Sequence, residues 1–154
     1  MTLYFAYGSN MQRAAMQRRC QGARAIGPAR LDGYRFFVGI DGWGSVRPKP
    51  GDIVHGVLWR LTPRDLAALN AYEMLHKGLY DVRCLAVRSG PRRVPAMIYL
   101  LRRRNAGRPK PGYVEMIAAA AREWKLPEAY VKSVERWSVS RWTGSRAIDV
   151  SEAA

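Results

Sequence analysis

The chain has 154 residues, of which 48% are hydrophobic and 25% are charged, and its formal net charge is +14 at pH 7. This length and composition predict a single globular domain with a core of its own and exclude a disordered chain. No apolar run approaches the length needed to cross a bilayer, and residues 3–7 are too short for the apolar part of a secretory signal, so we expect a cytoplasmic protein with no membrane partner.

The positive charge comes from arginine and lysine side chains that are spread along the whole chain. A nucleic-acid-binding domain would combine such a surface with a recognition motif, and the sequence contains no RNP-like, helix-turn-helix or zinc-finger pattern. We therefore expect a solvated basic surface that also attracts acidic small molecules, and we do not expect a nucleic-acid partner.

Two cysteines, Cys20 and Cys84, are far apart in the chain and form no Cys-x-x-Cys motif. A disulfide framework is therefore not expected, and reduced thiols agree with a cytoplasmic location.

The first predicted strand covers residues 3–7, which are apolar and rich in aromatic side chains. Gly8, Ser9 and Asn10 predict a turn that caps a helix over residues 11–20. Two interpretations of this turn stay open at this stage. Its free backbone N–H groups form an anion-binding site at the helix N-terminus, or it is an ordinary capped connection between a strand and a helix.

The middle of the chain predicts two further strands separated by loops. A loop at residues 27–28 precedes a strand over residues 34–40, which are aromatic and β-branched. Residues 49–52, Lys-Pro-Gly-Asp, predict a turn, and residues 46–50 are too rich in Pro and Lys for a central strand. Residues 53–61 predict a strand that is apolar on both faces, which suits a central position in a closed or covered sheet.

A strong helix start follows at Thr62, with Thr62 as N-cap, Pro63 at the first helical position and Asp65 at the third. The helix is predicted to end near Tyr72.

Glu73 continues the apolar stripe that Leu66 and Leu69 form on this helix. A carboxylate on the core side is costly unless it is paired or functional, so Glu73 is a candidate catalytic residue. Its apolar surroundings and its position at a helix C-terminus predict a raised pKa.

The rest of the chain predicts two more strands, two helices and a tail. The strands are expected over residues 79–87 and 94–101, the helices over residues 113–125 and from residue 127, and the tail over residues 138–154, which are expected to be partly mobile. Because strict alternation of strands and helices is absent, the pattern favours an α+β fold with a small mixed, barrel-like sheet and flanking helices, in one domain over residues 1–137.

Three groups of residues carry a resemblance to a known family. They are the Tyr-Phe-Ala-Tyr-Gly-Ser-Asn run at residues 4–10, the Pro-Gly-Asp-x-Val-x-Gly-Val-x-Trp run at residues 50–59, and Glu73 followed by Gly78-x-Tyr80. Together they make the chain similar to the γ-glutamylcyclotransferase family, with its AIG2-like relatives, from about Leu3 to Trp137.

The resemblance implies a cytoplasmic enzyme that cuts γ-glutamyl amides into 5-oxoproline and a free amine, in the setting of glutathione metabolism and without a metal or organic cofactor. It also implies a small mixed barrel with flanking helices. Glu73 would be the acid/base residue, and the substrate-binding residues would be Tyr4, Phe5, Ala6, Tyr7, Gly8, Ser9, Asn10, Tyr80 and Tyr113. The expected partner is a small γ-glutamyl substrate, and the expected assembly is a monomer or a homodimer.

The sequence departs from the family's pattern at Asn70, where an Asp is frequent, and at Met74, where a Gly is frequent. Such changes lie in the pocket wall and leave the identity of the leaving amine open. The alternatives are a cyclotransferase of other specificity, a non-catalytic small-molecule module or a polyanion-binding module. His55 and His76 could suggest a metal site with Glu73, since Glu73 and His76 form a Glu-x-x-His motif. Such a site is not expected, because residues 74–75 of that motif are predicted to be a loop and no third ligand has helical spacing.

Overall fold

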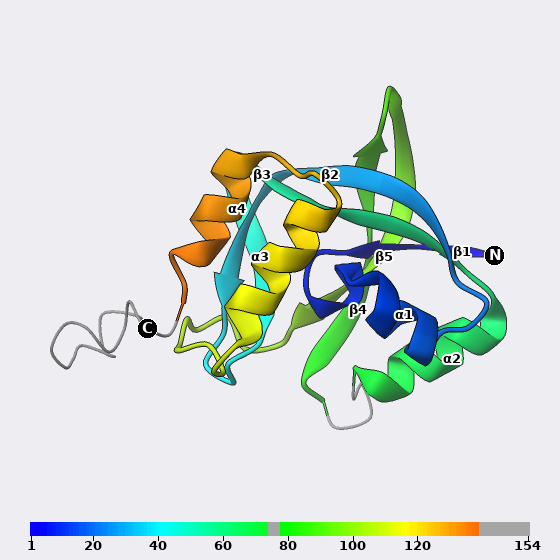
Figure 1. The fold of residues 1–154 in the computed structure, drawn as a ribbon, viewed down its shortest axis with the longest axis horizontal. Coiled ribbons are helices and arrows are strands. Elements are labelled where there is room, and N and C mark those ends of the chain that lie inside the picture. Colours follow the sequence, from blue (N-terminus) through cyan, green and yellow to red (C-terminus); the bar gives the residue numbers. More distant parts are fainter. Residues whose placement is uncertain (74–77, 139–154) are drawn as a thin grey trace, which may run out of the picture.

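The structure, a computed structural model, describes residues 1–73 and 78–138, which form a closed five-stranded barrel with the strand order β1-β3-β2-β4-β5 (Figure 1). The strands are β1 (Thr2–Ala6), β2 (Arg24–Val38), β3 (Gly44–Leu61), β4 (Tyr80–Ser89) and β5 (Arg92–Leu101). β1 runs antiparallel to β3 and parallel to β5, so the sheet is mixed. The predicted fold class is therefore confirmed. The division at residue 137 stays a prediction, because residues 139–154 lie outside the described part of the chain.

The longest elements are β2 and β3, which pair as one antiparallel hairpin from Arg24 opposite Arg60 to Val38 opposite Gly44. The predictions of a loop at residues 27–28 and of a turn at residues 49–52 are therefore wrong. Residues 46–50 belong to β3, but residues 46–48 pair with β2 alone in the described sheet, which agrees with the expectation that residues 46–50 do not form a central strand.

Two bulges explain why these residues look like loops in the sequence. The pairing shifts register between Ala25 and Gly27 and again between Asp32 and Tyr34. Gly27 (φ +138°) and Gly51 (φ +90°), the latter opposite the second shift, have positive φ angles, which glycine adopts at little cost. The Gly and Pro residues at positions 27–28 and 49–52 thus bend a continuous hairpin and do not end it.

The helices are α1 (Arg13–Arg19), α2 (Pro63–Tyr72), α3 (Tyr113–Glu123) and α4 (Glu128–Glu135). The last three agree with the predictions. The helix predicted over residues 11–20 is wrong at its start, because a 3₁₀ turn (Ser9–Met11) comes first and the extended Gln12 separates it from α1. The predicted cap is wrong too. Gly8 occupies the N-cap position of the 3₁₀ turn, and no side chain caps it.

The helices cover the barrel in two pairs, with α3 packed against α4 and α1 in contact with α2, while the β4–β5 hairpin projects beyond the rest of the molecule (Figure 1). Side chains from all these layers fill the core, including the fully buried Phe5, Met11, Leu58, Ile98 and Ile117. None of the helices in the described ranges is long and apolar enough to span a membrane. The barrel and its helices thus form one packed unit that supports the end of β1.

Candidate active site

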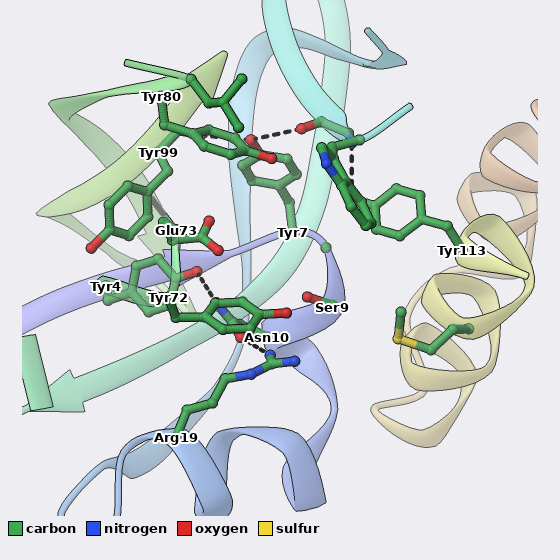
Figure 2. Close-up of a pocket in the computed structure, with 15 residues that line it drawn as sticks. Tyr4, Tyr7, Ser9, Asn10, Arg19, Tyr72, Glu73, Tyr80, Tyr99 and Tyr113 are labelled. Carbon is green, nitrogen blue, oxygen red and sulfur yellow. Dashed lines mark hydrogen bonds between the residues drawn. The ribbon is translucent and has the colours of Figure 1, made fainter. Parts of the chain in front are cut away.

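A cavity of about 370 Å³ opens where β1 ends, between the C-terminal end of α2 and the first turn of α3 (Figure 2). Eight of the predicted site residues line it: Tyr4, Tyr7, Gly8, Ser9, Asn10, Glu73, Tyr80 and Tyr113. These residues come from separate parts of the chain, and closure of the barrel brings them together.

The turn after β1 forms one wall of the cavity. Its 3₁₀ hydrogen bonds run from the Met11 amide to the Gly8 carbonyl (3.0 Å) and from the Gln12 amide to the Ser9 carbonyl (3.1 Å). Within residues 1–73 and 78–138, the backbone amides of Ser9 and Asn10 donate to no acceptor. Both residues line the cavity, and no side chain caps the turn.

Asn10 connects the turn to the side chains around it. Its Nδ2 donates to the hydroxyl oxygen of Tyr4 at 3.0 Å, and its Oδ1 accepts a hydrogen bond from Arg19. Because Asn10 is itself 3% exposed, these bonds fix the position of Tyr4 and Arg19 relative to the turn.

The helix α2 carries Glu73 to the opposite wall. Thr62 and Asp65 form a reciprocal capping box at its start, and Leu69 anchors it in the core with no exposed surface. Glu73 is the C-cap residue, four positions after Leu69, so its side chain leaves the helix on the same face. The predicted position of this carboxyl group on the core side is what the structure shows.

Tyrosine rings surround the carboxyl group of Glu73, which points toward Tyr4, Tyr7 and Tyr80 in the centre of the cavity (Figure 2). Burial raises the pKa of Glu73 to about 7, and the positive charge of Arg19 offsets part of this increase. Within residues 1–73 and 78–138, the carboxyl group makes no ion pair and no hydrogen bond. It can therefore gain and lose a proton near neutral pH.

The tyrosines themselves are held by hydrogen bonds and ring contacts. The Tyr7 hydroxyl donates to the Tyr99 carbonyl at 2.6 Å, and the Tyr113 hydroxyl oxygen accepts from the Gly44 amide at 2.9 Å. The ring of Tyr99 packs edge to face on those of Tyr4 and Tyr80. Burial raises the pKa of each of these phenols, so they stay protonated and act as neutral hydrogen-bonding groups.

Phe5 and Ala6, also predicted to bind substrate, lie elsewhere. Both are buried in the barrel core, with 0% and 1% of their surface exposed, and neither lines the cavity. The side chain of Phe5 points away from the cavity because successive side chains point to opposite faces of β1, and that of Tyr4 points into it. A Cβ atom on Gly56 would approach the Phe5 ring to 2.8 Å and the Ala6 carbonyl to 2.3 Å, which shows how tightly β3 packs on this part of β1.

The cavity has further lining residues that the sequence predictions missed: Arg19, Trp43, Gly44, Tyr72, Leu79, Tyr99 and Met116. A sequence signal existed for Arg19. It follows Ala15 by four residues and the buried Met16 by three, so helical spacing places it on the inward face of α1. Tyr99 reaches the cavity through the pairing of β5 in the barrel, and Trp43 comes from the connection between β2 and β3.

His55 lies outside the cavity that contains Glu73. His55 packs against Tyr130, with ring centroids 5.0 Å apart, and His76 lies outside the described residues. No group of three His, Cys, Asp or Glu side chains in the described ranges has the geometry to hold a metal ion.

The chain is similar to known proteins over most of its length. A family model described as "Gamma-glutamyl cyclotransferase, AIG2-like" matches residues 4–125. The human protein named Gamma-glutamylcyclotransferase is 26% identical over 97% of this chain and 86% of its own length, and the mouse protein of that name is 28% identical over 92% of this chain and 81% of its own. A solved structure titled "Gamma-glutamyl cyclotransferase" has a TM-score of 0.83 and 25% identity, covering 98% of this chain and 96% of its own.

Proposed function

The chain belongs to the gamma-glutamyl cyclotransferase, AIG2-like family, and from this premise we propose that it is a γ-glutamylcyclotransferase. Its reaction would convert a γ-glutamyl amide into 5-oxoproline and a free amine. The observation that carries the proposal is the Glu73 carboxyl group, which has a pKa of about 7 and lies in a tyrosine-lined cavity.

The reaction needs little covalent chemistry from the protein, because the nucleophile belongs to the substrate. The α-amine nitrogen attacks the γ-carbonyl carbon and forms the C–N bond of the ring, and the original amide C–N bond breaks. Such an intramolecular attack can reach effective molarities of about 10⁵–10⁸ M when the chain is held bent. The protein must hold that conformation, stabilise the oxyanion and move a proton from the α-ammonium to the leaving amine.

Glu73 fits the proton-transfer role because of its raised pKa. A carboxylate with an ordinary pKa near ~4.3 would take a proton from an ammonium group with a pKa near ~8 at a cost of about 5 kcal/mol. A pKa of about 7 for Glu73 leaves a difference of roughly 1 unit, or about 1.4 kcal/mol. We therefore assign Glu73 as the general base toward the α-ammonium and the general acid toward the leaving amine.

The remaining predicted residues divide into three groups. The free amides of Ser9 and Asn10 suit the oxyanion, and Tyr4, Tyr7, Gly8, Tyr80 and Tyr113 form the wall that holds the γ-glutamyl group. Phe5 and Ala6 do not contact the substrate and instead fix β1 in the core.

The choice of amine, the compartment and the assembly complete the proposal. The cavity holds about 370 Å³ and is lined by Trp43 and Met116 as well as by the tyrosines. We therefore favour small substrates, which are γ-glutamyl amino acids and small γ-glutamyl amines, with glutathione as a further candidate. Both cysteines are free thiols, Cys20 buried and Cys84 exposed, which agrees with the cytoplasm. We retain a monomer or a homodimer as the assembly.

The direct test is incubation of the purified protein with γ-glutamyl dipeptides, γ-glutamyl amines and glutathione, with 5-oxoproline and the released amine measured together. We expect equal amounts of both products from at least one compound. A blank across the whole panel would contradict the enzyme assignment. Binding of the same compounds without turnover would favour a non-catalytic small-molecule module instead.

A further inference from the structure

Arg19 is the positively charged side chain of the cavity, and its position follows from the packing of α1. The helix buries Ala15 and Met16, and Cys20 follows it in the core. Arg19 shares this inward face, so its long side chain is half-buried and ends at the cavity wall.

The guanidinium group of Arg19 is fixed on two sides. One of its Nη atoms donates to Oδ1 of Asn10, and its Cζ lies 3.7 Å from the ring centroid of Tyr72 (Figure 2). A planar cation that is hydrogen-bonded at one edge and stacked on one face loses little further freedom when it binds a ligand. Arg19 is therefore preorganised.

This cation lacks a carboxylate partner among residues 1–73 and 78–138. The ion pairs there involve Arg30, Arg35, Arg88, Arg102 and Arg122, all at the surface. Guanidinium carries five N–H donors, and the hydrogen bonds found for Arg19 use one of its nitrogen atoms. Glu73 shares the cavity but makes no ion pair with Arg19, so the remaining donors can serve a ligand.

The substrate of the proposed reaction offers a matching group. Its α-carbon carries both the ammonium that must reach Glu73 and a carboxylate. Because these two groups share one carbon atom, the carboxylate must lie next to Glu73 as well. An anion in that position would add to the negative charge of Glu73 unless a cation faces it.

We propose that Arg19 binds the α-carboxylate of the γ-glutamyl group, so that Glu73 and Arg19 together recognise the zwitterionic α-carbon. This assignment rests on the proposed function and adds a substrate-binding residue to it. Bidentate contact between guanidinium and carboxylate would fix the orientation of the α-carbon as well as its position, and so aim the amine at the γ-carbonyl.

Three substrates separate this role from the alternatives. γ-Glutamylalanine carries both carboxylates, γ-glutamylethylamine lacks that of the leaving group, and the third is γ-glutamylalanine with its glutamyl α-carboxylate converted to a carboxamide. We expect Arg19→Gln to lower kcat/KM about 10- to 100-fold for the first two substrates and less than about threefold for the third. Arg19→Lys should fall between the wild type and Arg19→Gln, because lysine keeps the charge and loses the bidentate geometry.

Arg18→Gln is the matched control, since Arg18 is the exposed neighbour on the same helix and its loss changes the net charge equally. It should leave all three rates within about twofold of the wild type. An equal loss on all three substrates in Arg19→Gln would show that Arg19 only supports Asn10, and would overturn the proposal. Unchanged turnover of γ-glutamylethylamine would overturn it too, by assigning Arg19 to the carboxylate of the leaving amino acid.

Binding of the product distinguishes a failure of this inference from a failure of the proposed function. NMR titration compares 5-oxoproline with 2-pyrrolidone, which is the same ring without the carboxylate. We expect Arg19→Gln to weaken 5-oxoproline binding at least tenfold and to leave 2-pyrrolidone binding unchanged. This result would support the carboxylate site even if no substrate were turned over, whereas equal 5-oxoproline affinity in both proteins would overturn it.

Discussion

The chemistry of this site at the scale of single residues depends on how Glu73 is surrounded. Five tyrosine hydroxyl groups around it remain protonated because burial raises their pKa values, so they supply dipoles and no countercharge. Arg19 is the charged group that favours the ionised carboxylate. Burial outweighs it, and the result is a carboxyl group that titrates near neutral pH.

Replacing Glu73 with Gln should abolish proton transfer and leave the fold intact. The amide has nearly the same shape, but it cannot accept and return a proton, so we expect 5-oxoproline formation to fall by about 10²–10⁴-fold. Binding of 5-oxoproline should change by only a few-fold. Burial disfavours the Glu73 carboxylate, so the melting temperature of Glu73→Gln at pH 8 should equal or exceed that of the wild type.

The pH profile provides the control for this assignment. The general base must be ionised in the free enzyme, so kcat/KM should decline below pH about 7 and fall roughly tenfold for each further unit. A base with an ordinary pKa would sustain activity down to about pH 5. An acid limb near that lower value, or comparable turnover in Glu73→Gln and the wild type, would remove Glu73 from the mechanism.

At the scale of elements, α2 positions Glu73, and the N-terminus of α2 is tied to the loop before β2. Asp65 is 3% exposed and accepts hydrogen bonds from the Thr62 amide (3.0 Å), the Thr62 hydroxyl (2.8 Å) and the Gly22 amide (3.0 Å). Burial alone would raise the pKa of Asp65, but these hydrogen bonds outweigh it and lower the pKa below its usual value. The carboxylate therefore links the helix to the barrel as well as capping it.

Replacing Asp65 with Asn should destabilise the protein by about 1–3 kcal/mol, because the amide NH₂ would face a backbone N–H and leave a buried donor without an acceptor. A group whose folded pKa is lowered contributes stability above its unfolded pKa of about 3.9, and this contribution disappears as the pH falls. The difference in free energy of unfolding between the two proteins should thus shrink below pH about 4. Urea denaturation at pH 7 and pH 3.5 measures it.

Asp52→Asn is the matched control for that change. Its carboxylate pairs with Arg35 at 2.8 Å, but 36% of the Asp52 side chain and 56% of the Arg35 side chain are exposed. An exposed pair contributes about 0–1 kcal/mol, so this variant should lie close to the wild type at both pH values. Equal destabilisation by the two substitutions would contradict the structural role assigned to Asp65.

The elements that the sequence predicts well are those with local signals. Thr62, Pro63 and Asp65 mark the start of α2 within four residues, and helical spacing places Glu73 on its inner face. The sequence does not predict the continuous β2–β3 hairpin, because the segments around Gly27 and Gly51 are rich in Gly and Pro, as turns are. Only the pairing between the two strands shows that these glycines lie at bulges. The bond from Gly22 to Asp65 joins residues 43 positions apart, so no local pattern could indicate it.

The whole molecule has one feature that neither the barrel nor the cavity requires, which is its net charge of +14. The absence of nucleic-acid-binding motifs led to the expectation of a solvated surface. The structure shows that one of these positive charges, that of Arg19, lines the cavity that the substrate must enter. A positive potential of this kind raises the local concentration of anions and is screened by salt.

The charge should therefore appear as a salt effect that depends on the substrate. γ-Glutamylalanine has a net negative charge at pH 7.5, whereas γ-glutamylethylamine is neutral overall. We expect kcat/KM for the dipeptide to fall about two- to tenfold between ~10 mM and ~200 mM NaCl, and kcat/KM for the amine to change less than about twofold. Identical salt responses would show that the surface charge does not act on substrate binding.

Heparin chromatography tests the alternative of a polyanion-binding surface. A protein with several phosphate contacts loses about 10³–10⁵-fold in affinity between ~50 mM and ~200 mM salt. Retention that withstands about 200 mM salt would therefore indicate a polyanion site with strong binding. We expect weak retention, because the basic side chains are spread along the whole chain and the sequence contains no nucleic-acid recognition motif that would gather them.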